Sequence, residues 1–207
     1  MKTVVIRDDD LSYAVETILR GGLVAVPTET VYGLAGNGLD PEAVAKIYDV
    51  KGRPAIKPLS LLVPGLDVAA TVCAEIPDRA KLLADAFWPG PLTIVLPRRN
   101  NVPEIVTAGG DTIGVRCPDH AKTLEFLRLA GIPAAAPSAN ISDKPSPKSA
   151  EDVLEYFDGK IDCVIDGGVC TLGVESTLVL LTADGYKILR QGALPEDDIR
   201  RVLGLGG

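Results

Sequence analysis

The sequence predicts a three-layer α/β fold built on a twisted sheet of mixed parallel and antiparallel strands. Its 207 residues show no break in composition, which indicates a single domain over residues 1–207. Hydrophobic residues make up 46 % and charged residues 24 %, as in a globular protein with an ample core. Strand-type and helix-type segments alternate, but hairpin-like neighbours are mixed in, so the sheet is not purely parallel.

The strands are predicted from short runs rich in Val, Leu, Ile and Ala that end at turn residues. The last two runs flank Ala183-Asp184-Gly185, a turn that predicts a β-hairpin. The expected strands are 3–6, 23–26, 59–63, 92–96, 112–116, 133–136, 162–165, 177–181 and 186–189.

The helices are predicted from their start and stop signals. Asp40 followed by Pro41 is typical of a helix start, and Ser149 with Asp152 forms a capping box. Gly131 follows an expected helix at the position where glycine commonly ends one. The expected helices are 10–20, 40–50, 77–87, 119–130, 149–157 and 195–203.

The charge distribution indicates a small anionic ligand. The formal net charge of −7 makes the chain a poor general binder of nucleic acid or of an anionic membrane. The segment 51–65, in contrast, carries Lys51, Arg53 and Lys57 and no acidic residue. A cationic loop on an acidic protein favours a local site for an anion.

The cysteine and histidine content argues against a metal site. The four cysteines have no metal-ligand spacing, and His120 is the single histidine. Free thiols suit a reducing compartment, and the sequence shows neither a signal peptide nor an apolar run of membrane length. We therefore expect a cytoplasmic protein without a membrane partner.

The polar residues gather where the expected strands end, which is where open α/β sheets carry their functional groups. Cations and hydroxyl donors of this kind suit a polyphosphate. The sequence has no Walker A pattern, no G-x-G-x-x-G and no G-x-S-x-G elbow. The loop residues concerned are Lys51, Arg53, Lys57, Arg116 and Arg190 among the cations, and Thr30, Thr112, Ser138, Ser146, Ser176 and Thr177 among the hydroxyls.

Each of these features also has a purely structural interpretation. The stretch KGRP is commonly a solvated turn, and PSAN is commonly a Pro/Ser turn. Arg116 could pair with a carboxylate such as Asp119, and His120 fits the first turn of a helix. Glu29 and Glu175 are better suited to anchor the backbone or a cation than to act as a general base.

Seven motifs together resemble the YrdC-like threonylcarbamoyladenylate synthase family, in the order in which that family has them. The resemblance covers about residues 11–194 and implies the YrdC-like fold, with its sheet around a concave basic cavity. The motifs are PTETVYGL, KGRP with KPL, WPGPLT, GVRCP, APSAN with SP, GVESTLV and RQGAL.

The resemblance implies a reaction. L-threonine, bicarbonate and ATP would give threonylcarbamoyl-AMP and pyrophosphate, with Mg²⁺ accompanying ATP and no tightly bound metal site on the protein. A separate transferase complex would receive the released intermediate and modify the tRNA adenosine next to the anticodon, with at most a weak tRNA contact by this chain.

The resemblance also implies site residues. Thr30, Arg116, Ala136 and Ser176 match positions that hold L-threonine, with Arg116 on its carboxylate. Lys51 and Arg53 form the Lys-x-Arg motif, to which we assign a catalytic role, and Ser138 with Asn140 forms the Ser-x-Asn motif. The expected ATP contacts are Lys51, Arg53, Lys57, Thr112, Ser138, Asn140, Ser146 and Arg190.

Two departures and two alternatives stay open. Lys57 and Leu62 occupy positions that are Asn and His in long family members, which puts the threonine contact of that His in doubt. The sequence ends after the expected helix 195–203, so we expect the short form without an additional C-terminal domain. The alternatives are an RNA-binding YrdC-like paralogue without synthase activity and a paralogue that adenylates another acyl group.

Overall fold

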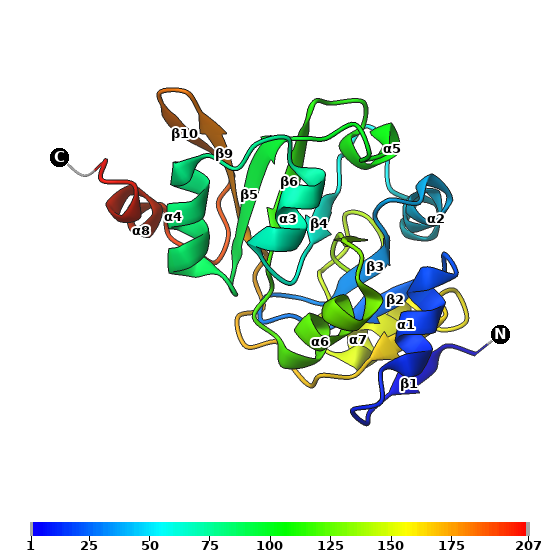
Figure 1. Ribbon diagram of the computed structural model, residues 1–207. Coiled ribbons are helices and arrows are strands. Elements are labelled where there is room, and N and C mark those ends of the chain that lie inside the picture. The colour runs from blue at the N-terminus through cyan, green and yellow to red at the C-terminus, as the bar shows by residue number, and fades with distance from the viewer. Residues whose placement is uncertain (1, 206–207) are drawn as a thin grey trace.

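The computed structural model describes residues 2–205, which form one ten-stranded sheet with helices around it. The strand order is β1-β8-β2-β3-β7-β4-β6-β5-β9-β10. Figure 1 shows β1 at one end of the sheet, near the N-terminus, and the β9–β10 hairpin with α8 at the other. The strands are β1 Val4–Ile6, β2 Val24–Val26, β3 Gly33–Asn37, β4 Ser60–Leu62, β5 Leu92–Pro97, β6 Thr112–Arg116, β7 Ala134–Ala135, β8 Cys163–Ile165, β9 Thr177–Thr182 and β10 Gly185–Arg190.

The sheet is mixed, as the sequence predicts. β8 pairs in parallel with both β1 and β2, and the pairs β4–β6 and β5–β9 are parallel as well. The pairs β2–β3, β3–β7, β4–β7, β5–β6 and β9–β10 are antiparallel. The predicted hairpin across residues 183–185 is confirmed as β9–β10.

The helices begin and end close to the signals in the sequence. The Asp40 side chain accepts a hydrogen bond from the backbone N–H of Glu42, and Ser149 and Asp152 form the predicted capping box. Gly131 ends its helix in the left-handed conformation at φ 67°. The helices are α1 Ser12–Leu19, α2 Pro41–Lys51, α3 Leu66–Val72, α4 Asp78–Phe87, α5 Glu104–Thr107, α6 Ala121–Ala130, α7 Ala150–Phe157 and α8 Glu196–Val202.

Two apolar cores lie on opposite faces of the sheet around β2. Ala25 belongs to the larger core, with Val44 of α2 and Val153 of α7, because successive residues of a strand face opposite sides. Val24 lies in the smaller core, with Phe126 of α6. Helix layers on both faces of the sheet give the three-layer architecture that the sequence predicts.

The sequence did not reveal β3, α3 or α5. The β3 sequence, GLAGN, contains two glycines and an asparagine, which have low strand propensity. Tertiary pairing overrides this preference because β3 lies between β2 and β7. A Cβ on Gly36 would approach Ile47 to 3.1 Å and Leu23 to 3.2 Å, so glycine lets the core close around the strand. α3 and α5 are too short to show a clear helical period.

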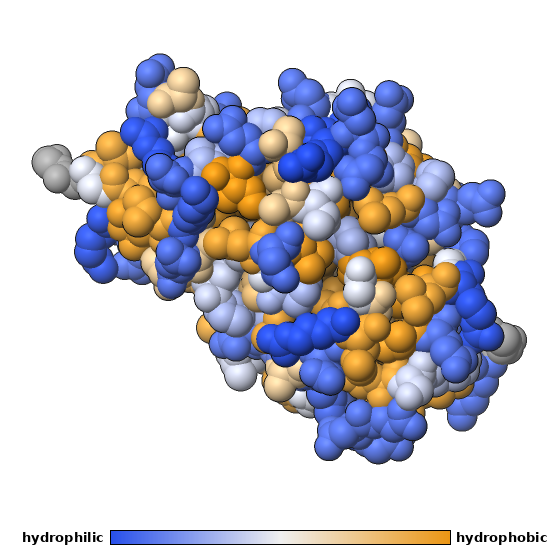
Figure 2. Space-filling model, in the orientation of Figure 1, coloured by the Kyte–Doolittle hydropathy of each residue, from blue (hydrophilic) through white to orange (hydrophobic). Residues whose placement is uncertain are grey.

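The outer surface of the helices carries both polar and apolar side chains. Figure 2 shows polar side chains interspersed with apolar groups on the face that carries α3, α4 and α6. Leu82 of α4 and Leu129 of α6 are among the exposed apolar residues. Within residues 2–205, no helix combines the length and the apolar character that crossing a bilayer requires.

Candidate functional site

A cavity of about 230 Å³ opens at the middle of the sheet. It is bounded by strands β3, β4, β5, β6, β9 and β10 and by the segments that follow β2 and β7. Three arginines and one glutamate are the charged groups in its wall. The lining residues are Thr28, Thr30, Val31, Tyr32, Gly33, Arg53, Pro58, Leu59, Ser60, Leu62, Thr93, Arg116, Ala136, Pro137, Ser138, Glu175, Ser176, Leu178 and Arg190.

Arg116, at the end of β6, is held by a buried carboxylate. Its Nη2 donates to Glu29 Oε1 over 2.7 Å and to Thr30 Oγ1 over 2.9 Å, and its Nε donates to the carbonyl oxygen of Gly90. Glu29 Oε2 accepts the backbone N–H of Asp119. Among the described residues, Nη1 of Arg116 has no acceptor, and it is not one of the buried atoms without a partner.

The segment Thr28-Glu29-Thr30 supports this arginine. Thr28 Oγ1 donates to the carbonyl oxygen of Val31, and it lies 2.8 Å from Thr30 Oγ1. Since a hydroxyl has one proton to donate, Thr30 is the donor in that pair and Thr28 the acceptor. Thr30 Oγ1 in turn accepts from Arg116. The polar residues at the end of β2 therefore fix the guanidinium in one orientation.

Ser176 and Arg190 form a second group on the cavity wall. The Nε and Nη2 atoms of Arg190 donate to the carbonyl oxygen of Ser176 over 3.1 and 2.9 Å. Nη2 of Arg190 also lies 3.2 Å from Ser176 Oγ, which is 2.8 Å from Thr93 Oγ1. Burial lowers the pKa of Arg190; the nearby charge of Glu175 opposes this effect, whereas the charges of Arg116 and Arg53 add to it.

Thr177 joins the two loops that carry Ser176 and Arg190. Its Oγ1 donates to the carbonyl oxygen of Leu194 over 2.6 Å and accepts the backbone N–H groups of Gly192 and Leu194. A Cβ on Gly192 would lie 2.3 Å from the carbonyl oxygen of Glu175. Glycine is required here because the two backbones are in direct contact.

Lys51 anchors the loop that follows β7. Its Nζ donates to the backbone carbonyl oxygens of Ser138 and Asn140, and the residue is 1 % exposed. Asn140 Oδ1 accepts a hydrogen bond from the Ser138 hydroxyl, so the two side chains of the Ser-x-Asn motif bond to each other. Burial, followed by the nearby charge of Arg53, lowers the pKa of Lys51 to about 7.

Glu175 is the acidic residue of the cavity wall. Its Oε1 accepts the Ser146 hydroxyl over 2.5 Å, and this bond is the main reason that its pKa is lowered, with a smaller contribution from Arg190. Within residues 2–205, no lysine or arginine nitrogen lies within 4.0 Å of its carboxylate. Glu175 is therefore an ionised group that none of the neighbouring arginines pairs with directly.

Seven of the expected site residues line the cavity together: Thr30, Arg53, Arg116, Ala136, Ser138, Ser176 and Arg190. The other five, Lys51, Lys57, Thr112, Asn140 and Ser146, lie outside the wall. Lys51, Asn140 and Ser146 contact it through the hydrogen bonds above. Thr112 opens β6, opposite Pro97.

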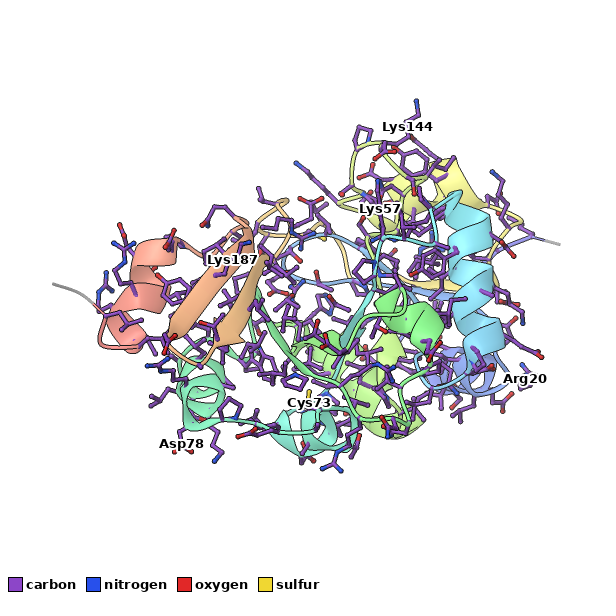
Figure 3. All side chains as sticks on the ribbon, turned by 90° about the horizontal axis from the view of Figure 1, so that it is seen from above. Arg20, Lys57, Cys73, Asp78, Lys144 and Lys187 are labelled. Atoms are coloured by element: carbon purple, nitrogen blue, oxygen red, sulfur yellow. The ribbon has the colours of Figure 1, made fainter. Side chains whose placement is uncertain are left out.

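The two departures from the family pattern have different positions. Leu62 lines the cavity and gives it an apolar patch. Lys57 is exposed and forms an ion pair with Asp143 at 3.3 Å. Figure 3 shows Lys57 and Lys144 on the same side of the molecule, whereas Lys187 lies on the β9–β10 hairpin. Lys57 thus ties the loop after α2 to the loop after β7.

Two features that the sequence analysis weighed lie outside the cavity wall. His120 precedes α6 as its N-cap, and burial lowers its pKa. None of the four cysteines lines the cavity, and burial raises the pKa of the Cys117 thiol beside Arg116 to about 11. No group of three or more His, Cys, Asp or Glu residues in the described part of the chain could hold a metal ion.

Glu29 anchors a cation and a backbone N–H, as the sequence analysis expects, but the motif did not show which groups these are. Thr-Glu-Thr at the end of a buried strand was a visible signal, because polar side chains there need partners. The partner of Glu29 is Arg116, which lies 87 positions along the chain, and sequence spacing cannot show such a pair.

The fold and the cavity define a class: a mixed α/β protein with a cavity whose wall carries three arginines and one glutamate. Comparison with known families identifies the family within this class. The model of the Sua5/YciO/YrdC family, described as "Telomere recombination", matches residues 16–192. The chain belongs to the Sua5/YciO/YrdC family.

Two similar relatives carry the name threonylcarbamoyl-AMP synthase. The protein from Pyrococcus abyssi is 51 % identical over 187 residues, which cover 90 % of this chain and 55 % of the relative. The protein from Bacillus subtilis is 41 % identical over 198 residues, covering 95 % of this chain and 57 % of the relative. The chain thus spans slightly more than half the length of each.

Solved structures agree with the fold. The P. abyssi Sua5 structure complexed with L-threonine superposes with a TM-score of 0.95 at 47 % identity, covering 99 % of this chain and 61 % of that one. The E. coli YciO structure superposes with a TM-score of 0.81 at 22 % identity, covering 94 % and 96 %. The second likeness supports the fold alone.

Proposed function

We propose that this chain is an L-threonylcarbamoyl-AMP synthase, a nucleotidyltransferase that joins L-threonine, bicarbonate and ATP and releases pyrophosphate. One observation carries the proposal: a cavity in which Arg116, held by Glu29, shares the wall with Arg53 and Arg190. An amino-acid carboxylate and a triphosphate together need several cations at one site. The names of the P. abyssi and B. subtilis relatives and the L-threonine complex of P. abyssi Sua5 support the same assignment.

In this proposal Arg116 binds the carboxylate of threonine. Nη1 is its free donor, so the contact is made from one side of the guanidinium while Glu29 and Thr30 hold the other. Ser176 and the backbone of Ala136 complete the amino-acid end of the cavity. Leu62 supplies apolar wall where long family members have a histidine.

Arg53, Ser138 and Arg190 contact the nucleotide. Lys51 acts indirectly because its ammonium holds the carbonyl oxygens of Ser138 and Asn140. We therefore propose that Lys51 is a positioning residue, and that Arg53, whose Nε and Nη2 hold its own loop at Lys57 and Pro58, presents Nη1 to the phosphates. Lys57, Thr112, Asn140 and Ser146 lie outside the cavity wall and stay predicted ATP contacts.

The chemistry follows from positioning and charge neutralisation. The amine of threonine, once unprotonated, combines with bicarbonate to give a carbamate and water. A carbamate oxygen attacks the α-phosphorus of ATP, the bond to the β,γ-phosphates breaks, and pyrophosphate leaves. The arginines stabilise the negative charge that builds on the phosphates. A bound Mg²⁺ supplies further neutralisation of the phosphate charge.

The product tests this assignment. The protein is incubated with ATP, bicarbonate and L-threonine, and mass spectrometry with a pyrophosphate assay follows the products. We expect threonylcarbamoyl-AMP and pyrophosphate in equal amounts, and no adenylate when bicarbonate is removed. ADP and phosphate as products would contradict the proposal.

We further propose that the intermediate is released to a separate transferase complex that modifies tRNA. Direct RNA binding is the alternative function, and the net charge of −7 disfavours it. Titration with tRNA at two salt concentrations separates the two. Weak and strongly salt-dependent binding agrees with the synthase, whereas tight binding without any synthase product favours the RNA-binding alternative.

A further inference from the structure

Glu175 places a negative charge in the wall of the cavity that is proposed to bind anionic substrates. A carboxylate beside an incoming triphosphate is repelled by it, so its presence weakens nucleotide binding unless a cation lies between them. No arginine pairs with the carboxylate directly: in the described part of the chain none approaches it within 4.0 Å, although the charge of Arg190 helps to lower its pKa. Arg190 donates instead to the carbonyl oxygen of the neighbouring residue, Ser176.

One carboxylate oxygen of Glu175 is available. Oε1 accepts the Ser146 hydroxyl, while Oε2 has no donor within residues 2–205 and is not among the buried atoms without a partner. The bond to Ser146 holds the side chain in place, since it ties the loop before β9 to the loop after β7. Glu175 lines the cavity, and an ionised, oriented carboxylate oxygen is suited to a hard cation.

Two cations could occupy this position: the ammonium of threonine or the Mg²⁺ that accompanies ATP. The proposed reaction disfavours the ammonium, because a carboxylate would keep the amine protonated and so oppose carbamate formation. Mg²⁺ is commonly bound through one or two protein carboxylates together with substrate phosphates, so a single Glu fits it. The hydrogen bond to Ser146, a predicted ATP contact, also places Glu175 at the phosphate end.

We propose that Glu175 is the protein ligand for the Mg²⁺ of bound Mg·ATP, held in place by Ser146. This inference rests on the proposed function, in that it takes ATP as a substrate of the cavity. It adds one protein ligand to the expectation that Mg²⁺ arrives with ATP and has no tightly bound site on the protein. It also explains why a cavity with three arginines keeps one carboxylate in its wall.

Calorimetry of ATP binding, with and without Mg²⁺, tests the proposal. The variants are Glu175→Gln and, as a matched control, Glu125→Gln, which makes the same change at an exposed position of α6. In Mg²⁺ we expect Glu175→Gln to bind ATP about tenfold more weakly than the wild type. In EDTA it should bind ATP at least as tightly as the wild type, because the repulsion is gone. The control should match the wild type in both conditions.

This reversal of sign separates metal binding from a structural role, which would weaken binding in both conditions. A second readout is electron paramagnetic resonance of Mn²⁺ with ATP, in which Glu175→Gln should leave more Mn²⁺ unbound by protein. An equal effect of the substitution with and without metal would overturn the inference. So would a loss confined to threonine affinity, which would assign Glu175 to the ammonium. Absence of ATP binding to the wild type would instead overturn the proposed function itself.

Discussion

The Arg116 guanidinium and the Glu29 carboxylate form a buried ion pair, with Nη2 2.7 Å from Oε1 and each side chain 9 % exposed. The pair links the end of β6 to the segment after β2. Around it, Thr30 Oγ1 and the carbonyl oxygen of Gly90 accept from Arg116, and Glu29 Oε2 accepts the backbone N–H of Asp119, which leaves Nη1 of Arg116 for a ligand. These bonds hold the guanidinium and the carboxylate in one arrangement.

Glu29→Ala should destabilise the fold. The substitution leaves the Arg116 charge buried without its partner, and breaking one side of a buried pair costs about 3–5 kcal/mol. Glu29→Gln keeps an acceptor for Arg116 and should cost less. Urea denaturation measures both variants against Glu125→Ala on the surface of α6. Equal stability of Glu29→Ala and the wild type would show that the pair does not hold the site together.

Substitutions of Arg116 and Arg53 should affect different ligands, because the two residues are assigned to different halves of the cavity. Arg116→Ala should weaken threonine binding by about 2–5 kcal/mol, the loss of a partly buried charge-assisted contact, and change ATP binding less. Arg53→Ala should show the opposite pattern. Calorimetry of each ligand on each folded variant gives the comparison. If Arg116→Ala abolishes ATP binding and leaves threonine binding intact, the two halves are assigned the wrong way round.

Lys51 should make the free energy of unfolding depend on pH. Its pKa is lowered from 10.5 to about 7 in the folded state. Between these values the unfolded chain binds a proton that the folded chain does not, so the contribution of this group to stability rises with pH. Lys51→Met removes the titration and keeps the length of the side chain. The difference in unfolding free energy, wild type minus variant, should therefore increase from about pH 7 to pH 10. A difference that does not change with pH would contradict the lowered pKa of Lys51.

Thr177→Val should loosen the loops that carry Ser176 and Arg190. It removes one hydroxyl that donates to Leu194 and accepts two backbone N–H groups, and unsatisfied buried groups cost about 1–3 kcal/mol. Thr177→Ser keeps these bonds and should stay near the wild type. Thermal unfolding and ATP affinity are measured together. Wild-type values for the valine variant would mean that the loops hold their positions without Thr177.

Much of the fold could be predicted because local signals agreed with tertiary structure. The Asp40 and Ser149 caps and the residues 183–185 turn stand where the sequence indicates. β3 could not be found, since GLAGN becomes a strand only between β2 and β7. Local propensity contains no information about such pairing.

The sequence predicted which residues belong to the site better than it predicted how these residues are arranged. The motif resemblance named the arginines and serines that meet in the cavity, although their strands lie far apart in sequence. It placed Lys51 on phosphate, whereas the structure buries the ammonium against two backbone carbonyl oxygens. Lysine is rarely buried so completely, so composition and spacing favour an exposed one.

The most direct test of the proposed synthase is pyrophosphate release with ATP, Mg²⁺ and bicarbonate, measured with threonine, serine, alanine or no amino acid. Arg116 and Ser176 line the same cavity as the predicted nucleotide contacts. Pyrophosphate release should therefore require an amino acid that binds to Arg116 and Ser176 beside the nucleotide. We predict rapid release with threonine and bicarbonate together and little without either. Equal release with serine, with alanine or with no amino acid would contradict the assignment of threonine to this cavity.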